Sequence, residues 1–124
     1  MRASMVVLVL TVTLVAAAPD PNLWDRVREA GQGAGDMVRA YNDMREANWR
    51  NSDKYFHARG NADAASRGPG GRWASEVISN TREFVDRLRG QDPADSARDQ
   101  EANRWGRNGG DPNRYRPKGL PQKY

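Results

Sequence analysis

The stretch DMVRAYNDMREANWRNSDKYFHARGNADAASRGPGG, residues 36–71, decides the fold class of this chain. It holds the end of one helical pattern near Ala47, a serine placed as a helix N-cap at Ser52, and a glycine-rich segment from Arg67 to Gly71. Proline cannot continue a helical hydrogen-bond ladder and glycine reverses the chain at little cost, so we expect a helix to stop at this segment. Two helices separated by a break are therefore predicted here.

Apolar residues recur at steps of three and four on both sides of this stretch, which is typical of amphipathic helices. Gly31, Gly33 and Gly35 interrupt the first helix, and we expect it to fray or bend there because each glycine weakens a helix interior. Asp92 and Pro93 open the last helix as an N-cap followed by proline at the first helical position. The pattern predicts an all-α fold with helices over residues 22–47, 52–67, 72–89 and 93–106.

Residues 108–124 carry three prolines and three glycines and show no helical period. This composition predicts a C-terminal tail without regular structure. We expect the tail to lie across the helices through the side chains of Tyr115 and Leu120.

The first residues have the layout of a secretory signal peptide. Arg2 forms a short basic region, an apolar run extends from Met5 to Val15, and three alanines follow. Pro19 is a poor residue directly after a scissile bond, which favours cleavage after Ala16 or Ala17. The apolar run is shorter than the roughly 20 residues that span a bilayer. We therefore expect a signal peptide over residues 1–17 and a secreted domain over residues 18–124.

The secreted domain has little material for a hydrophobic core. It has no cysteine, so disulfides cannot hold it together, and only 10 of its 107 residues are Leu, Ile, Val or Phe. This share is far below the ~20% under which chains begin to look disordered. We expect a marginal monomer that gains apolar contacts from an oligomer or from a lipid surface.

The apolar stripe of the third predicted helix, residues 72–89, has two interpretations. Such a stripe most often packs into a protein core, and it also suits a lipid or ligand surface. Arginines flank the stripes, and their long stems lie along apolar surface while their heads reach phosphate groups. Both interpretations stay open on spacing alone; the flanking residues are Arg26, Arg28, Arg39, Arg82 and Arg87.

The sequence contains no recognisable catalytic or metal-binding motif. His57 is the only histidine, there is no thiol, and no zinc motif or phosphate-binding loop is present. We therefore predict a protein that is not an enzyme and uses no metal or cofactor, with His57 in a structural role beside Tyr55 and Phe56. Carboxylates lie three or four residues from arginines and are interpreted as solvated helix pairs, namely Asp25 with Arg28, Glu83 with Arg87, and Asp95 with Arg98.

Four segments together resemble the serum amyloid A family: the stretch quoted above, WASEVISNTREFVDRL, DQEANRWGR and DPNRYRPKGLPQKY. The resemblance extends from Glu29 to Tyr124. It implies a secreted acute-phase apolipoprotein of high-density lipoprotein, folded as a four-helix bundle with its C-terminal tail packed across the helices. It also implies homo-oligomers when lipid is absent. The resemblance leaves open a chemoattractant acting on leukocyte receptors, an opsonin binding bacterial surface proteins, and a retinol carrier.

The resemblance assigns phospholipid binding to the apolar faces of the first and third helices. The same surfaces are implicated in carrying retinol within family oligomers. The corresponding residues here are Leu23, Trp24, Val27, Met37, Val38, Tyr41, Trp73, Val77, Ile78, Phe84, Val85 and Leu88.

A sequence pI near 9.8 indicates an anionic partner. Secretion favours heparan sulfate or anionic lipid over nucleic acid. Arg39 and Arg67 match positions implicated in heparin binding in the family, while a third family arginine corresponds to Gly35, which predicts weaker glycan affinity. In the tail, Arg114, Arg116, Lys118 and Lys123 offer a second anionic contact, and the alternative, that these charges serve only solubility, is the commoner case on sequence alone.

The N-terminal segment PDPNLWDRVREAGQGAG departs from the family pattern. Family members commonly carry a dense Phe- and Leu-rich segment there that drives lipid insertion and fibril formation. Leu23, Trp24 and Val27 are the only sizeable anchors left, and the charges at Asp20, Asp25, Arg26 and Arg28 oppose a dry β-zipper. We therefore predict weaker lipid affinity and lower amyloid propensity than the family norm.

Overall fold

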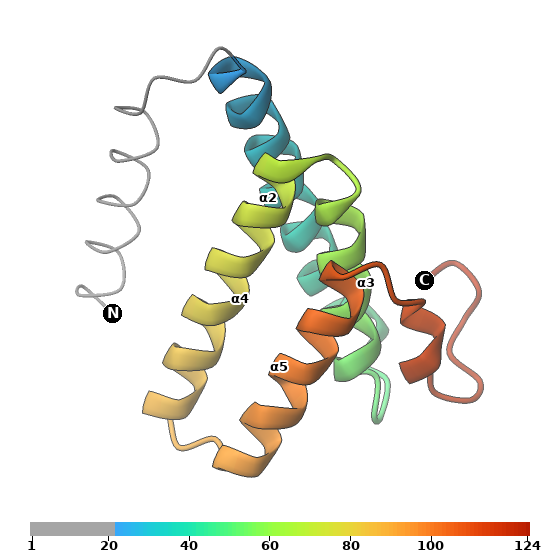
Figure 1. Cartoon of the computed structure of the whole chain (residues 1–124). Coiled ribbons are helices and arrows are strands. Elements are labelled where there is room, and N and C mark those ends of the chain that lie inside the picture. Colours follow the sequence, from blue (N-terminus) through green and yellow to red (C-terminus); the bar gives the residue numbers. More distant parts are fainter. Residues whose placement is uncertain (1–21) are drawn as a thin grey trace.

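The computed structural model describes residues 22–124, and every regular element in this range is helical (Figure 1). The all-α class with four helices is therefore confirmed. The predicted signal peptide, residues 1–17, lies outside the described residues. No helix among residues 22–124 combines the length and apolar character that a membrane crossing requires. The elements are α2 (Leu23–Ala47), α3 (Asp53–Ala65), α4 (Pro69–Leu88), α5 (Pro93–Arg107) and the 3₁₀ turn η1 (Pro112–Tyr115).

Helix α3 is the centre of the bundle. It contacts α2, α4, α5 and η1, while α4 also packs against α2 and α5. Figure 1 shows α4 and α5 as an antiparallel pair, with η1 and the tail on the other side of α5. The central position explains why α3 has no single buried face; its buried residues are Tyr55, Phe56, His57, Ala58, Gly60, Asn61 and Ala64.

Helix α2 runs without a break through its three glycines. The prediction that the helix frays there was therefore wrong. Gly33 faces α4, where an added Cβ would lie 2.8 Å from the Cα of Gly71. Glycine at this point lets the backbones of α2 and α4 approach closely. The contact with α4 offsets the intrinsic weakness of glycine in a helix.

The glycine-rich segment opens a helix instead of only ending one. Helix α4 begins at Pro69, not near Arg72 as predicted. Proline suits the first position of a helix because the N–H that it lacks would have no helical partner there. Gly68 occupies the N-cap position with φ of +122°, a conformation that glycine adopts without steric cost.

The predicted cap at Ser52 also takes a different form. Ser52 does precede α3, but its hydroxyl donates a hydrogen bond to the carbonyl of Trp49 at 2.7 Å and does not accept from the amides of α3. Ser52 is buried in the turn between α2 and α3. Its hydroxyl therefore closes this turn, and the helix begins with Asp53 near its positive end.

A buried polar network joins α3, α4 and α5. The amide nitrogen of Asn61 donates to Ser79 Oγ at 3.0 Å and to Asn103 Oδ1 at 3.0 Å. Its oxygen accepts from Nη1 of Arg107 at 3.1 Å. These hydrogen bonds compensate for burying polar side chains, and they fix how the three helices sit against one another.

The tail packs against α3 through Leu120, which forms a small apolar cluster with Tyr55 and Phe56. Tyr55 donates a hydrogen bond from its hydroxyl to the carbonyl of Tyr124 at 2.6 Å. The guanidinium of Arg116 donates to the Tyr55 hydroxyl at 3.0 Å and to the carbonyl of Pro121 at 2.8 Å. The predicted tail crossing the helices through Tyr115 and Leu120 is observed, although its first part forms the η1 turn.

Candidate functional site

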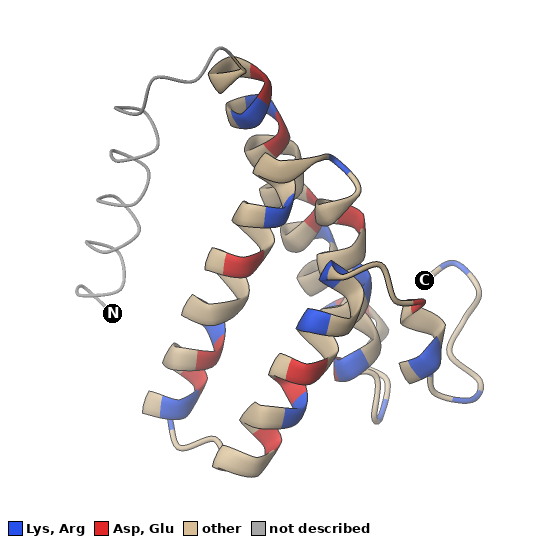
Figure 2. Cartoon of the chain, in the orientation of Figure 1, with Lys and Arg blue, Asp and Glu red and all other residues tan. Residues whose placement is uncertain are grey.

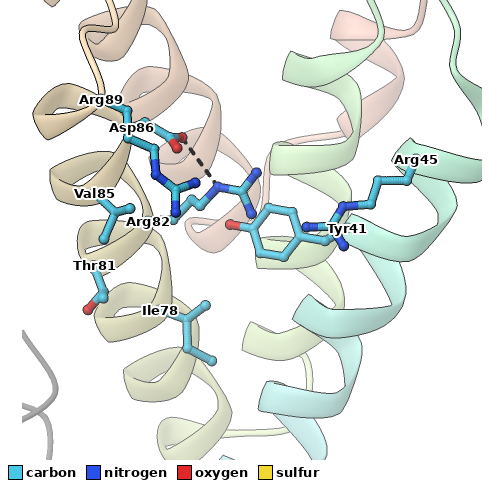
Figure 3. A pocket seen from close by; sticks show the side chains of 8 residues that line it. All are labelled: Tyr41, Arg45, Ile78, Thr81, Arg82, Val85, Asp86 and Arg89. Carbon is cyan, nitrogen blue, oxygen red and sulfur yellow. Dashed lines mark hydrogen bonds and ion pairs between the residues drawn. The ribbon is translucent and has the colours of Figure 1, made fainter. Parts of the chain in front are cut away.

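A groove separates α2 from α4. The two helices meet near their N-terminal ends, where Gly70 lies so close to the backbone of Arg26 that an added Cβ would overlap it. They diverge from there (Figure 1), and the space between them forms an open groove of about 350 Å³ (Figure 3). The groove is lined by Tyr41, Arg45, Ile78, Thr81, Arg82, Val85, Asp86 and Arg89.

The groove combines apolar walls with guanidinium groups. Ile78 and Val85 line it from α4 and the ring of Tyr41 from α2 (Figure 3). The guanidinium of Arg82 lies 4.7 Å from the centre of the Tyr41 ring and forms an ion pair with Asp86 at 3.3 Å. Burial raises the pKa of Tyr41 to about 12, so its phenol stays neutral. Such a groove suits an amphipathic molecule with an apolar chain and an anionic head.

The large apolar side chains of α2 and α4 point mostly outward. Trp24 is 77% exposed and Leu88 is 64% exposed, and Val27, Val38 and Phe84 are exposed as well. The interpretation of the α4 stripe as core is therefore wrong for Phe84 and Leu88. Helix α4 packs on the bundle through a different face made of small and polar residues, namely Gly70, Gly71, Ala74, Ser75, Ser79 and Glu83.

Most of the other predicted lipid-contact residues border this outward face. Met37 differs, because only 1% of it is exposed and it belongs to the core. It faces Gly60 of α3, where an added Cβ would lie 3.2 Å from the Met37 sulfur. The absence of a side chain at Gly60 makes room for Met37, so this residue turns toward α3. The half-buried candidates are Leu23, Tyr41, Trp73, Val77, Ile78 and Val85.

Two of the predicted glycan-contact residues lie together. Arg67 makes a two-pronged contact with Asp36, from Nε to Oδ2 at 2.8 Å and from Nη2 to Oδ1 at 3.0 Å. Arg39 reaches the same carboxylate at 3.6 Å. Asp36 is buried while both arginines keep exposed surface, so the group presents one net positive charge to solvent.

The tail residues have different roles. Arg114 is exposed, with its guanidinium 4.3 Å from the centre of the Trp105 ring, and Lys118 is exposed. Arg116 is half-buried, and its guanidinium donates hydrogen bonds to the hydroxyl of Tyr55 and to tail carbonyls. It therefore holds the tail in place rather than facing a ligand. Figure 2 shows basic and acidic residues interspersed along the helices, without a long stretch of one sign.

Sequence reasoning missed a buried cluster of three side chains, His57 from α3, Glu83 from α4 and Asp99 from α5. Glu83 was predicted to pair with Arg87 in solvent. It is buried instead and accepts a hydrogen bond from Ser96 Oγ at 3.1 Å, whereas the predicted pairs of Asp25 and Asp95 with nearby arginines do form.

The surroundings of this cluster shift the pKa values of two of its members. Burial lowers the pKa of His57, and burial together with the neighbouring Asp99 raises the pKa of Glu83 to about 7. The three residues come from three helices and follow no metal-binding spacing. No sequence signal marks the cluster, because only the structure shows that Glu83 lies on the packed side of α4, four residues after Ser79.

Comparison with known proteins places this architecture in a family. Residues 24–124 match the family model described as "Serum amyloid A protein". The chain is 70% identical over 98 residues to serum amyloid A-5 protein of Mesocricetus auratus, covering 79% of this chain and 96% of that protein. It is 59% identical over 115 residues to serum amyloid A-2 protein of Oryctolagus cuniculus, covering 93% and 94%, and 67% identical over 101 residues to serum amyloid A protein of Notamacropus eugenii, covering 81% and 80%. The chain therefore belongs to the serum amyloid A family.

Proposed function

We propose that this protein is a secreted acute-phase apolipoprotein that binds phospholipid and high-density lipoprotein through the outward faces of α2 and α4. The observation that carries the proposal is the exposure of Trp24, Phe84 and Leu88 on helices whose opposite faces pack on the bundle. Trp24 lies at the N-terminal end of α2 and Phe84 and Leu88 at the C-terminal end of α4, so these exposed apolar side chains offer contacts at both ends of the helix pair.

The exposed side chains account for a reversible association. Covering the exposed parts of Trp24, Phe84 and Leu88 would contribute on the order of 5 kcal/mol, at about 1.5–3 kcal/mol for each fully buried side chain. The arginines beside them add contacts to lipid phosphates while their stems lie on the apolar surface. Lipid-free copies have the same surface available, which supports homo-oligomers as the competing state.

The groove between α2 and α4 favours a second candidate function, the carriage of a single amphipathic molecule. Its volume of about 350 Å³ lies at the lower end of the range for ligand pockets. Retinol is one candidate ligand, and the guanidinium groups of Arg45, Arg82 and Arg89 favour a ligand with an anionic head over an alcohol. Ligand-dependent quenching of tryptophan fluorescence, stronger for a fatty acid than for retinol and weakened by Arg82→Ala, tests this candidate.

Binding of sulfated glycans is proposed as a further property of the pair formed by Arg39 and Arg67. The support is that two guanidinium groups converge on one buried carboxylate and both retain exposed donors. A guanidinium presents paired donors that match sulfate oxygens.

Flotation with phosphatidylcholine vesicles tests the lipid proposal. Trp24→Ala and Leu88→Ala should each weaken vesicle partitioning about tenfold, because each removes more than about 1.4 kcal/mol of apolar contact. Trp49→Ala is the matched control, since Trp49 is also exposed but lies in the turn after α2. Circular dichroism should show more helix with vesicles than without.

The alternatives give different outcomes. Equal partitioning of the wild type and all three variants would refute binding through these faces. A protein that stays lipid-free in plasma fractionated by density, while driving leukocyte migration or coating bacteria, would favour the signalling or opsonic role instead.

A further inference from the structure

The buried cluster of His57, Glu83 and Asp99 brings a nitrogen and two carboxylate donors together inside the bundle. One donor atom from each residue lies within 4.8 Å of the others. His57 is 5% exposed and Glu83 is 3% exposed, and Asp99 is buried as well. The three helices α3, α4 and α5 each supply one donor, so the arrangement depends on the tertiary fold.

Several polar atoms at this place have no hydrogen-bond partner among residues 22–124. They include Oε2 of Glu83 and Nδ1 of His57, both on side chains more than nine-tenths buried, while the His57 nitrogen that lies 3.8 Å from Oδ2 of Asp99 is Nε2. The hydroxyl of Tyr41 and Oε1 of Gln91 are also unpartnered, although Gln91 Nε2 donates to Asp99 at 2.8 Å. Buried polar atoms normally find partners. A proton shared between Glu83 and Asp99 would satisfy Oε2 of Glu83 alone, whereas a cation bound by all three residues would satisfy the imidazole nitrogen and both carboxylates together.

The local charge supports the same conclusion. The cations around the cluster are Lys54, which forms ion pairs with Asp95 and Asp99, Arg82, which pairs with Asp86, and Arg98, which pairs with Asp95. The carboxylates around the cluster outnumber these cations, so some carboxylates have no cation of their own. The acidic groups that face the cluster from the three helices are Asp53, Glu83, Asp86, Asp95 and Asp99.

We propose that His57, Glu83 and Asp99 form a zinc-binding site that ties α3, α4 and α5 together. An imidazole nitrogen with carboxylate oxygens suits Zn²⁺, whereas Ca²⁺ and Mg²⁺ prefer oxygen ligands alone. Donors around tetrahedral Zn²⁺ at about 2.0–2.2 Å are roughly 3.3 Å apart, so the cluster tightens on binding through rotation of the Glu83 and Asp99 side chains. A water molecule is the expected fourth ligand. The site is independent of the outward faces of α2 and α4.

Titration of the metal-free, lipid-free protein with zinc chloride tests the proposal. We expect one Zn²⁺ per chain by calorimetry and a midpoint of thermal unfolding that rises with Zn²⁺ concentration. His57 is the only histidine, so its ring signals in a nitrogen-15 NMR spectrum report directly on the site. They should shift with one equivalent of Zn²⁺ and should not respond to Ca²⁺ or Mg²⁺.

Matched variants separate this site from surface binding. Glu83→Gln and Asp99→Asn keep side-chain size and should weaken zinc binding at least about 100-fold, since even supporting residues cost about 10–100-fold. Glu76→Gln is the control because Glu76 is exposed on the same helix. It should bind as the wild type does.

Three results would overturn the proposal. They are the absence of stoichiometric uptake, unchanged affinity in both ligand variants, and His57 signals that do not move while zinc binds. The last readout uses the wild-type chain, so it decides the question even where a variant fails to fold as judged by circular dichroism.

Discussion

The carboxylate of Glu29 in α2 accepts a hydrogen bond from the backbone N–H of Gly70 in α4 at 3.0 Å. Helix α4 has glycine at its N-cap and receives no cap from that residue, so another helix supplies the acceptor. The contact fixes the end of the bundle at which α2 and α4 converge. The groove between the two helices opens from this point.

Glu29→Ala should lower the free energy of unfolding by about 1 kcal/mol, as expected for the loss of a helix cap. Urea denaturation followed by circular dichroism measures this change. Glu101→Ala, at an exposed position of α5, serves as the control and should stay within about 0.5 kcal/mol of the wild type. Equal stability of the two variants would show that Glu29 does not cap α4.

Gly31→Ala and Gly33→Ala form a matched pair within α2. Gly31 has open space around it, so alanine should raise the free energy of unfolding by about 0.5–1 kcal/mol through better helix propensity. Alanine at Gly33 should lower it by about 1–3 kcal/mol, because the new methyl meets the backbone of Gly71. Thermal or chemical denaturation reports both values, and a gain in both variants would contradict the close crossing.

Asn61→Ala should be strongly destabilising, by about 3 kcal/mol. Asn61 is fully buried, and its loss leaves Ser79, Asn103 and the guanidinium of Arg107 without their shared partner. Asn42→Ala, at an exposed position of α2, is the comparison and should change little. A loss below about 1 kcal/mol at Asn61 would mean that the network rearranges around the gap.

The docking of the C-terminus should depend on pH through Glu46. Hydrogen bonds from Lys123 and Tyr124 lower the pKa of Glu46 from its ordinary value of 4.5. A carboxylate with a lowered pKa stabilises the docked tail above the ordinary value and loses that effect as the pH falls through the lowered one. NMR signals of the Lys123 and Tyr124 amides should therefore change below pH 4.5. Glu46→Gln should abolish this transition, and its persistence would assign the transition to another group.

Gly35→Arg should strengthen binding to heparin. Gly35 is exposed, has open space around it, and lies one helical turn before Arg39, so the new guanidinium joins the pair formed by Arg39 and Arg67. Elution from a heparin column should need a higher salt concentration than for the wild type. Ala97→Arg adds the same charge at an exposed position of α5. An equal gain in heparin binding there would show that net charge, and not the position beside Arg39, causes the effect.

The apolar period located α4 but did not identify the side of α4 that faces the bundle. A stripe containing Phe84 and Leu88 resembles a core stripe, because spacing alone reports a face and not what covers it. The bundle instead buries Ser79 and Ala74, whose small size lets helices approach closely. Small residues contribute little to a hydropathy pattern, so the pattern of the sequence did not reveal the buried face of α4.

Helix boundaries and the partners of individual side chains were also predicted less well than the number of helices. Pro69 serves equally to end one helix and to begin the next, and only the position of Glu29 in space decides in favour of an early start. The role of Arg116 depends on Tyr55, far away in the sequence. Contacts of this kind become visible only once the helices are placed.

Packing through glycine, as at the contacts of Gly33 with Gly71 and of Gly106 with Ala58, lets the helices pack without the exposed side chains Trp24, Phe84 and Leu88. The residues that pack the helices and the residues of the outward faces are therefore largely different. If the outward faces bind lipid as proposed, exchanging Leu88 should change lipid binding and leave the helix packing as it is. The same arrangement leaves Trp24, Phe84 and Leu88 exposed in the single chain, so contacts between lipid-free copies through these side chains are the expected consequence.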